Sequence, residues 1–235
     1  GHFRQGTGIR HLFLIVPSIK NSNGYDLTDV DKIMSIPHSE TVDFINREGY
    51  NLEESLAVLT SKTNSWKAKT FAERKSAVLA YADYLEEHLI TAAKTITDHA
   101  YKTFPNSIAE VREGIDFIRY YAEVAEQMYD TKDTELRGYT GEYNKTSYEA
   151  RGTWMVISPW NFPFAIMVGP VIAALLAGNT VLFKSAPQTQ VVADITIGCM
   201  LVVGIPTDAI QFCDPNPSEA EKALRDERIN GVTFT

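Results

Sequence analysis

The chain has 235 residues, of which 44% are apolar and 22% charged, and a formal net charge of −8. The apolar share is ordinary for a globular protein, and the acidic balance argues against a nucleic-acid partner, because phosphate binding needs clustered Lys and Arg. The two cysteines, Cys199 and Cys213, match no disulfide or metal-ligand spacing, so we expect no metal site. The first residues do not read as a secretory signal, and a cytoplasmic location is expected.

Residues 1–50 form an N-terminal segment in which the sequence pattern predicts few helices or strands. A short buried strand is predicted over 12–16, a turn over 21–24 and a short helix over 26–36. The only approach to a G-x-G-x-x-G motif is Gly-Thr-Gly at 6–8, but His11 stands where the third glycine belongs. We therefore interpret it as part of a tail and not as a phosphate-binding loop.

Residues 51–130 are predicted to be helical. Leucines recur at helical spacing near the start of this region: Leu52, Leu56 and Leu59. Thr70 followed by Glu73 predicts a capping box, opening a helix that runs to about His99. After a break over 102–105, a third helix is expected to open at Ser107.

Residues 131–150 are polar and rich in turn formers, with an exposed strand predicted over 143–148. From 151 to 235 short strands alternate with helices, which indicates a parallel α/β sheet. Strands are predicted over 153–157, 180–183, 209–212 and 231–235, and helices over 164–177, 188–203 and 218–225. Because the last strand has no return element, we expect the chain to stop inside a buried strand of a larger sheet.

No charged residue lies between Trp154 and Phe183, and a membrane-spanning helix needs only ~20 apolar residues. Three prolines interrupt this stretch: Pro159, Pro163 and Pro170. They would leave backbone groups unpaired in lipid, whereas buried parallel strands also give unbroken apolar runs. We therefore expect no membrane partner.

The loop at 158–163 reads Ser-Pro-Trp-Asn-Phe-Pro and lies between a predicted strand and a predicted helix. Ligands of open α/β sheets bind at the carboxyl ends of the strands. Two prolines restrict this loop, so Asn161 offers a fixed NH₂ donor suited to an oxyanion, and Trp160 offers a flat face for a ring. A turn with a capping Asn and packing aromatics explains the residues equally well.

Lys184 ends the second predicted strand, after Ala-Gly-Asn-Thr-Val-Leu-Phe at 177–183. A lysine at that position reaches a ribose hydroxyl or a phosphate. From the residues alone, a solvated lysine that marks the end of the strand is the simpler interpretation.

Together, the segments 158–163 and 177–184 resemble the aldehyde dehydrogenase superfamily, and the resemblance extends from Leu52 to Thr235. Further segments resemble the branch of Δ1-pyrroline-5-carboxylate dehydrogenases, including the dehydrogenase portion of proline-utilisation proteins: 102–106, 109–113, 115–122 and 140–144. This branch oxidises glutamate semialdehyde to glutamate with NAD⁺. The implied fold is α/β: a helical region, then an incomplete Rossmann-like parallel sheet with flanking helices, and an oligomerisation strand.

The resemblance also implies roles for single residues. Asn161 matches the family's oxyanion-hole Asn, Lys184 matches the Lys that binds the adenosine ribose, and Phe162 would lie against the aldehyde chain. The residues that match the loop lining the nicotinamide and ribose are Ile157, Ser158, Pro159 and Trp160. Glu113 matches a substrate-side carboxylate, although a solvated helix Glu explains it as well. The strand at 143–148 matches the oligomerisation strand, which implies a homo-oligomer of the intact enzyme.

The chain departs from the family pattern near the cofactor. Pro187 stands where the family often has a ribose-binding Glu, and Asp-Pro-Asn-Pro-Ser at 214–218 replaces a Gly-rich loop, so the choice between NAD and NADP stays open. The family's nucleophilic Cys and general-base Glu lie beyond the matched region. Cys199 has the setting of a buried thiol, and neither it nor Cys213 is expected to be a nucleophile.

The resulting hypothesis is the cofactor-binding portion of an aldehyde dehydrogenase that oxidises the small aldehyde L-glutamate 5-semialdehyde to glutamate in proline degradation and is inactive alone. Two alternatives stay open: an aldehyde dehydrogenase with a different substrate, and a non-catalytic, degenerate nucleotide-binding domain.

Overall fold

The computed structural model describes residues 19–29, 31, 33, 35–36, 51–130, 135–213 and 216–235. The strand predicted over 12–16, the Gly-Thr-Gly at 6–8 and part of the loop at 214–218 lie outside the described residues. In the region of the helix predicted over 26–36, the N–H of Ile33 donates to the carbonyl oxygen of Asp29 at 3.1 Å, which is a helical spacing.

The helical region contains α2 (Leu52–Thr60), α3 (Ser65–Ala68), α4 (Phe71–Glu87), α5 (Leu89–Ala100) and α6 (Phe104–Asp130). The predicted capping box is present at the start of α4. Glu73 N–H donates to Thr70 Oγ1 at 3.3 Å, and the Glu73 carboxylate accepts from the Thr70 N–H at 2.7 Å. Two donors at the helix start are thereby satisfied.

Two predicted boundaries in this region were wrong. The helix predicted to reach His99 is interrupted at His88, whose φ of −108° and ψ of 21° are not helical; α5 then leaves in a new direction and buries Leu89 and Ile96. The helix α6 starts at Phe104 and not at Ser107, because Pro105 falls in its first turn, where a missing N–H costs nothing.

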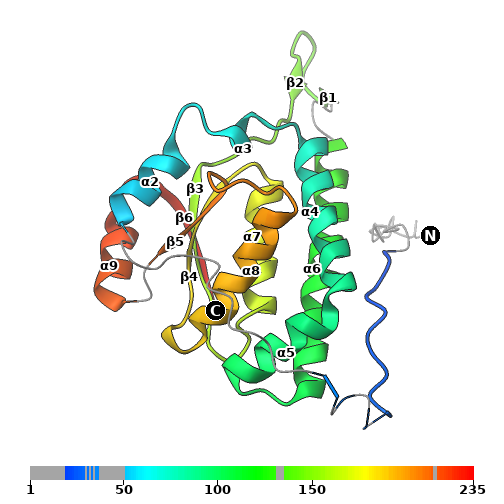
Figure 1. Ribbon diagram of the computed structural model, residues 1–235. Helices are drawn as coiled ribbons and strands as arrows, with labels where there is room; N and C mark the ends of the chain where they lie inside the picture. Colours follow the sequence, from blue (N-terminus) through cyan, green and yellow to red (C-terminus); the bar gives the residue numbers. More distant parts are fainter. Residues whose placement is uncertain are drawn as a thin grey trace, which may run out of the picture.

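Four parallel strands form the sheet: β3 (Thr153–Ile157), β4 (Thr180–Lys184), β5 (Ile210–Cys213) and β6 (Ile229–Phe234). Within the described residues their order is β5-β4-β3-β6, with every pairing parallel. The connections contain α7 (Ala165–Leu176), the 3₁₀ turn η1 (Pro187–Thr189), α8 (Gln190–Val202) and α9 (Pro217–Arg225). The predicted parallel α/β sheet is confirmed (Figure 1).

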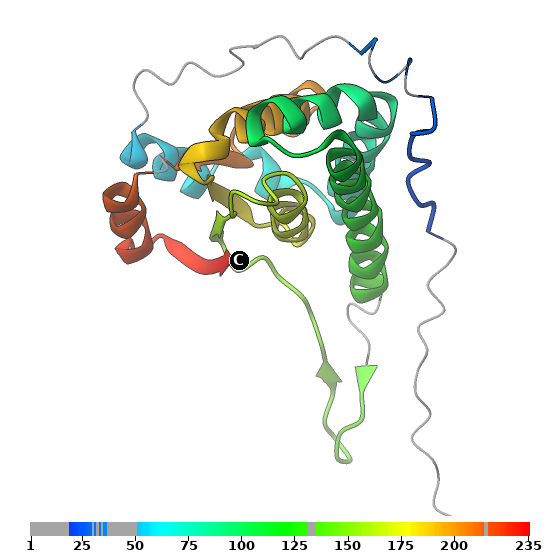
Figure 2. The ribbon, with the colours of Figure 1, turned by 90° about the horizontal axis from the view of Figure 1, so that it is seen from below.

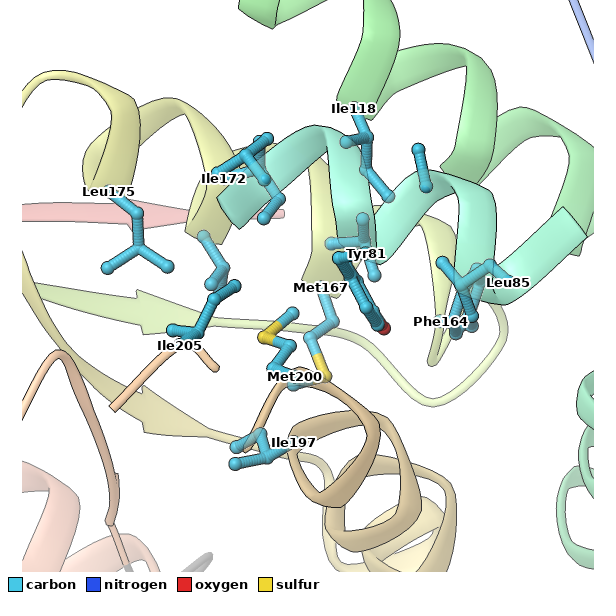
Figure 3. Close-up of a cluster of buried hydrophobic side chains, with 14 of the residues drawn as sticks. Tyr81, Leu85, Ile118, Phe164, Met167, Ile172, Leu175, Ile197, Met200 and Ile205 are labelled. Atoms are coloured by element: carbon cyan, nitrogen blue, oxygen red, sulfur yellow. The ribbon is translucent and has the colours of Figure 1, made fainter. Parts of the chain in front are cut away.

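Helices cover both faces of the sheet (Figure 1). On one face α7 and α8 lie against the strands, with α4, α5 and α6 outside them, and Val156, Val181 and Phe183 point into this larger core. Figure 3 shows side chains of α4, α6, α7 and α8 meeting there. On the other face α2 and α9 pack on Met155 and Leu182. Successive side chains of β3 and β4 therefore point to opposite faces of the sheet and enter the two cores in turn, as expected of strands that are buried on both faces.

The two turn glycines that follow helices take the left-handed conformation. Gly178 after α7 has φ +83° and Gly204 after α8 has φ +93°, and each glycine directly follows the range predicted for its helix, 164–177 and 188–203. The strand β6 differs from the prediction of a buried strand: Val232 is 40% and Phe234 76% exposed. It lies at the edge of the sheet and pairs only with β3 among the described strands.

A hairpin of β1 (Glu135–Leu136) and β2 (Asn144–Lys145) projects away from the rest of the protein (Figure 2). The exposed strand expected over 143–148 is therefore present, but it is only two residues long and has an antiparallel partner. No helix among the described residues is both long and apolar enough to cross a membrane.

Candidate functional site

The loop at 158–164 lies at the carboxyl edge of the sheet, after the strand on which the chain order reverses. From β3 the chain passes to β4 and β5 on one side, and β6 returns to the other side of β3. The end of β3 is flanked by both neighbours, since Ile157 is in register with Lys184 and with Phe234. Such a switch point is where open α/β sheets bind ligands.

A backbone hydrogen bond fixes the loop to the neighbouring strand. The N–H of Ser158 donates to the carbonyl oxygen of Lys184 at 3.1 Å. The two segments singled out in the sequence are therefore adjacent in space, and Asn161 lies on a loop whose base is part of the sheet.

Asn161 is exposed. Its carbonyl oxygen accepts from Lys102 Nζ at 3.0 Å, while its side-chain amide makes no hydrogen bond to any described residue. An exposed amide donor on a loop restricted by Pro159 and Pro163 is available to a ligand at the end of the sheet. The interpretation of Asn161 as a helix-capping residue was wrong, because α7 begins at Ala165 and its N-cap is Phe164.

The other predicted loop residues differ in burial. Trp160 is 61% and Phe162 38% exposed, so both present aromatic surface to solvent at the carboxyl edge. Ile157 and Pro159 are half-buried. Ser158 is buried, and its Oγ finds no hydrogen-bond partner among the described residues.

Lys184 is half-buried at the end of β4, and its Nζ donates to the carbonyl oxygen of Ser185 at 3.3 Å. No carboxylate pairs with it in the part of the chain that the structure describes. Pro187 and Gln188 follow as exposed residues of η1. The position of the family's Glu therefore offers no side-chain acceptor, while Gln188 presents an amide beside it.

Glu113 is exposed on α6 and makes no hydrogen bond or ion pair with a described residue. Nothing in the described residues tests its predicted role at the substrate, which stays a prediction. The carboxylate that does contact the loop is one helical turn earlier and was missed. Glu110 accepts from the N–H groups of Phe164 at 2.8 Å and Ala165 at 3.2 Å.

The sequence places Glu110 at helical spacing between two small residues, Ser107 and Gly114, and only the structure shows that all three are buried on the inward face of α6. A carboxylate on such a face requires buried donors. Its side chain is 0% exposed and pairs with Lys102, whose Nζ lies 2.6 Å from Glu110 Oε2.

The two thiols lie in apolar surroundings. Cys199 borders a small cavity with Leu85, Ile96 and Phe164, and burial raises its pKa above the ordinary value. Cys213 is 1% exposed and packs in the core beneath α2 and α9. Cys213 ends β5 at the carboxyl edge, in register with Lys184, and that neither thiol is a nucleophile stays a prediction. Among the described residues, no cluster of three or more His, Cys, Asp or Glu could hold a metal ion.

These features fit a dinucleotide in part. The half-buried Lys184, the unpaired Ser158 hydroxyl and the exposed Trp160 ring surround the switch point, where a ribose and a flat ring would be held. Pro187 removes one acceptor. An exposed amide donor beside such a site is able to stabilise negative charge that develops on a carbonyl oxygen.

Comparisons with known proteins agree with this arrangement. The sequence model described as the aldehyde dehydrogenase family matches residues 38–235. The 1-pyrroline-5-carboxylate dehydrogenase of Staphylococcus aureus is 32% identical over 218 residues, which are 91% of this chain and 42% of that protein. The bifunctional protein PutA of Klebsiella aerogenes is 36% identical over 192 residues, which are 80% of this chain and 14% of that protein.

Solved structures show the same similarity. A variant of proline utilization A from Bradyrhizobium japonicum superposes with a TM-score of 0.78 at 28% identity, covering 93% of this chain and 22% of that one. A 1-pyrroline-5-carboxylate dehydrogenase from Thermus with bound NAD gives 0.71 at 28% identity, covering 77% of this chain and 35% of that one. The chain thus spans less than half the length of these relatives.

Proposed function

Because the chain belongs to the aldehyde dehydrogenase family, we propose that it forms the cofactor-binding part of an enzyme that oxidises L-glutamate 5-semialdehyde, the open form of Δ1-pyrroline-5-carboxylate, to glutamate with NAD⁺. The substrate is supported by the relatives named above, at 32% and 36% identity. The observation that carries the proposal is the position of Asn161: its exposed, unpaired amide lies on the loop at the switch point, bonded at its base to Lys184.

The role of Asn161 is to stabilise charge. When a nucleophile adds to the aldehyde carbon, the carbonyl oxygen gains negative charge, and the Asn161 NH₂ donates a hydrogen bond to it. Phe162, the next residue in the chain, presents exposed aromatic surface that would lie against the aldehyde chain. The thiolate nucleophile and the general base are, in this proposal, not Cys199 or Cys213 but residues outside the 235-residue chain.

For the cofactor, Lys184 would hold the adenosine ribose, and Ile157, Ser158, Pro159 and Trp160 would line the nicotinamide and its ribose. When NAD⁺ is bound, it takes up the hydride that leaves the aldehyde carbon. Water then releases the acid, so that glutamate semialdehyde, water and NAD⁺ give the glutamate anion, NADH and two protons. NADP is the less favoured cofactor in this proposal, because the relative from Thermus was solved with NAD.

Replacement of Asn161 tests this proposal in the enzyme that contains the chain. Loss of one oxyanion donor lowers kcat by about 10²–10³, so Asn161→Ala is expected to lose activity by that factor while its affinity for NAD⁺ and its melting temperature stay near those of the wild type. A kcat within a few-fold of the wild type would contradict the role of Asn161.

Two further measurements separate the alternatives. Values of kcat/KM for glutamate semialdehyde against acetaldehyde and propionaldehyde distinguish the proposed substrate from another aldehyde. The isolated 235-residue chain is expected to bind NAD⁺ in a calorimetric titration and to form no NADH with glutamate semialdehyde. Turnover by this chain alone would show that it carries its own nucleophile.

The second candidate function is a non-catalytic, degenerate nucleotide-binding domain. It is favoured by Pro187, which stands exposed where a ribose acceptor would be. In that case the titration gives no NAD⁺ or NADP⁺ binding at millimolar concentration. Assembly into a homo-oligomer through the β1–β2 hairpin and a cytoplasmic location remain proposals that sedimentation and cell fractionation test.

A further inference from the structure

The helix α7, which follows the Asn161 loop, begins without a cap of its own. Its N-cap residue is Phe164, whose side chain accepts no hydrogen bond from the helix. The acceptor comes from α6: Glu110 Oε1 binds the N–H groups of Phe164 and Ala165, 54 and 55 residues further along the chain. A carboxylate there satisfies unpaired donors and opposes the positive end of the helix dipole.

A lysine balances this buried carboxylate. The Glu110 side chain is 0% exposed, and Lys102 Nζ lies 2.6 Å from its Oε2. The lysine side chain is itself only 15% exposed. A buried charge is tolerated when it is paired and hydrogen-bonded, and each of these two residues supplies the partner for the other.

Lys102 also reaches the loop directly. Its Nζ donates to the Asn161 carbonyl oxygen at 3.0 Å and lies 3.9 Å from the centroid of the Phe162 ring. Together, Lys102 and Glu110 contact the segment 161–165 at its backbone carbonyl, one ring and two N–H groups. The Asn161 amide has no hydrogen-bond partner among the residues that the structure describes, so its direction depends on how this backbone is held.

We propose that Lys102 and Glu110 form a positioning pair that fixes the direction of the Asn161 amide. The inference rests on the proposed function for its catalytic consequence. Neither residue is assigned a contact with substrate. A catalytic donor displaced by about 1 Å costs up to ~10²-fold in rate, so the pair matters to catalysis through the geometry of Asn161.

A purely structural role is the competing explanation. The pair would then tie α6 to α7, and its loss would lower stability without a specific effect on kcat. Lys94→Met provides a matched control, because Lys94 pairs with Asp98 at 2.9 Å on α5 with the same 15% side-chain exposure. A purely structural role predicts that Lys102→Met and Lys94→Met have the same kcat.

The test measures kcat, KM, NAD⁺ affinity and melting temperature for Lys102→Met, Lys102→Arg, Glu110→Gln and the control. We expect Lys102→Met to lower kcat by roughly 10- to 100-fold with NAD⁺ affinity unchanged, and Lys102→Arg to recover most of kcat. Glu110→Gln keeps an oxygen for the two N–H groups but loses the charge that holds Lys102, so kcat falls while α7 stays capped. Equal kcat for Lys102→Met and Lys94→Met overturns the inference.

Hydrogen exchange supplies a readout that needs no activity. If the wild type oxidises no aldehyde, the proposed function fails. Exchange of the backbone amides then still tests whether Lys102 and Glu110 hold the loop in place. In Lys102→Met the amides of the loop 160–165 are expected to exchange faster than in the wild type, and in Lys94→Met at the wild-type rate. Unchanged exchange of the loop in Lys102→Met overturns the positioning role.

Discussion

Ser158 and Lys184 are joined by a backbone hydrogen bond of 3.1 Å, from the N–H of the first to the carbonyl oxygen of the second. This bond extends the pairing of β3 and β4 by one residue beyond Ile157. It brings the start of the Asn161 loop and the lysine at the end of the next strand together at one edge of the sheet, and the predictions on cofactor and chemistry depend on it.

Replacement of Lys184 by Met is expected to weaken NAD⁺ binding about tenfold, since one charge-assisted hydrogen bond contributes roughly 1.5 kcal/mol. Methionine keeps much of the apolar stem, so the strand end should still fold. Calorimetric titration measures the affinity. Lys222→Met on the exposed surface of α9 is the control and should bind as the wild type does; equal affinity of both variants would remove Lys184 from the site.

The cysteines of this chain are expected to be dispensable. Because Cys213 is 1% exposed and burial raises the pKa of Cys199, neither supplies a thiolate. Cys199→Ala and Cys213→Ala should each retain kcat within about twofold of the wild type, whereas loss of a covalent nucleophile costs many orders of magnitude. Slow alkylation of both thiols by iodoacetamide in the native protein is the accompanying check. A collapse of kcat in either variant would identify a nucleophile.

Gly114 allows α6 to approach the start of α7. A Cβ at this position would overlap the ring of Phe164, and Phe164 is only 2% exposed, so its ring has to shift within the core. Gly114→Ala is therefore expected to lower the free energy of unfolding by about 1–3 kcal/mol, the usual cost of overpacking. Urea denaturation followed by circular dichroism measures it.

Gly169→Ala is the matched control for this substitution. Its Cβ would lie 3.3 Å from Phe117 Cδ2, a contact that a small shift relieves, and alanine gains up to ~1 kcal/mol of helix propensity. The control should be nearly neutral. A loss as large as that of Gly114→Ala would show that packing against Phe164 is not the cause.

Arg228 links the start of β6 to α2 by donating to Glu53 at 2.6 and 2.7 Å and to Asp226 at 2.7 Å. Its hydrogen bonds hold the pKa of both carboxyls below their ordinary values. A carboxyl with a lowered pKa stabilises the fold above the ordinary pKa and loses this contribution as pH falls through the lowered one. Part of the stability should therefore disappear below about pH 4.

Arg228→Gln is expected to reduce the dependence of stability on pH. Its free energy of unfolding should fall less steeply than that of the wild type as pH decreases through the range of about 5 to 3. Urea titrations at a series of pH values measure the slope. Arg225→Gln, which removes the exposed i,i+4 pair with Glu221 on α9, should keep the wild-type slope. An unchanged slope in Arg228→Gln would contradict the assignment.

Much of the region 151–235 could be read from the sequence, because short apolar runs bounded by Pro and Gly specify where strands and helices begin and end. Gly178 and Gly204 stop their helices in the left-handed conformation that glycine tolerates. The loop carrying Asn161 was placed between β3 and α7 for the same reason. Local patterns determine these features, and local patterns are visible in a single sequence.

Only the tertiary structure decided which distant groups meet. The sequence predicted a helix from Ser107, but it did not indicate that Glu110 on this helix would cap the start of a second helix 54 residues further along the chain. In the same way, the helix predicted from Thr70 to about His99 continued across His88, and the break there is set by the packing of α5 against α6 and α8. Periodicity records that a side chain is buried, whereas its partner depends on contacts between segments that the chain brings together only on folding.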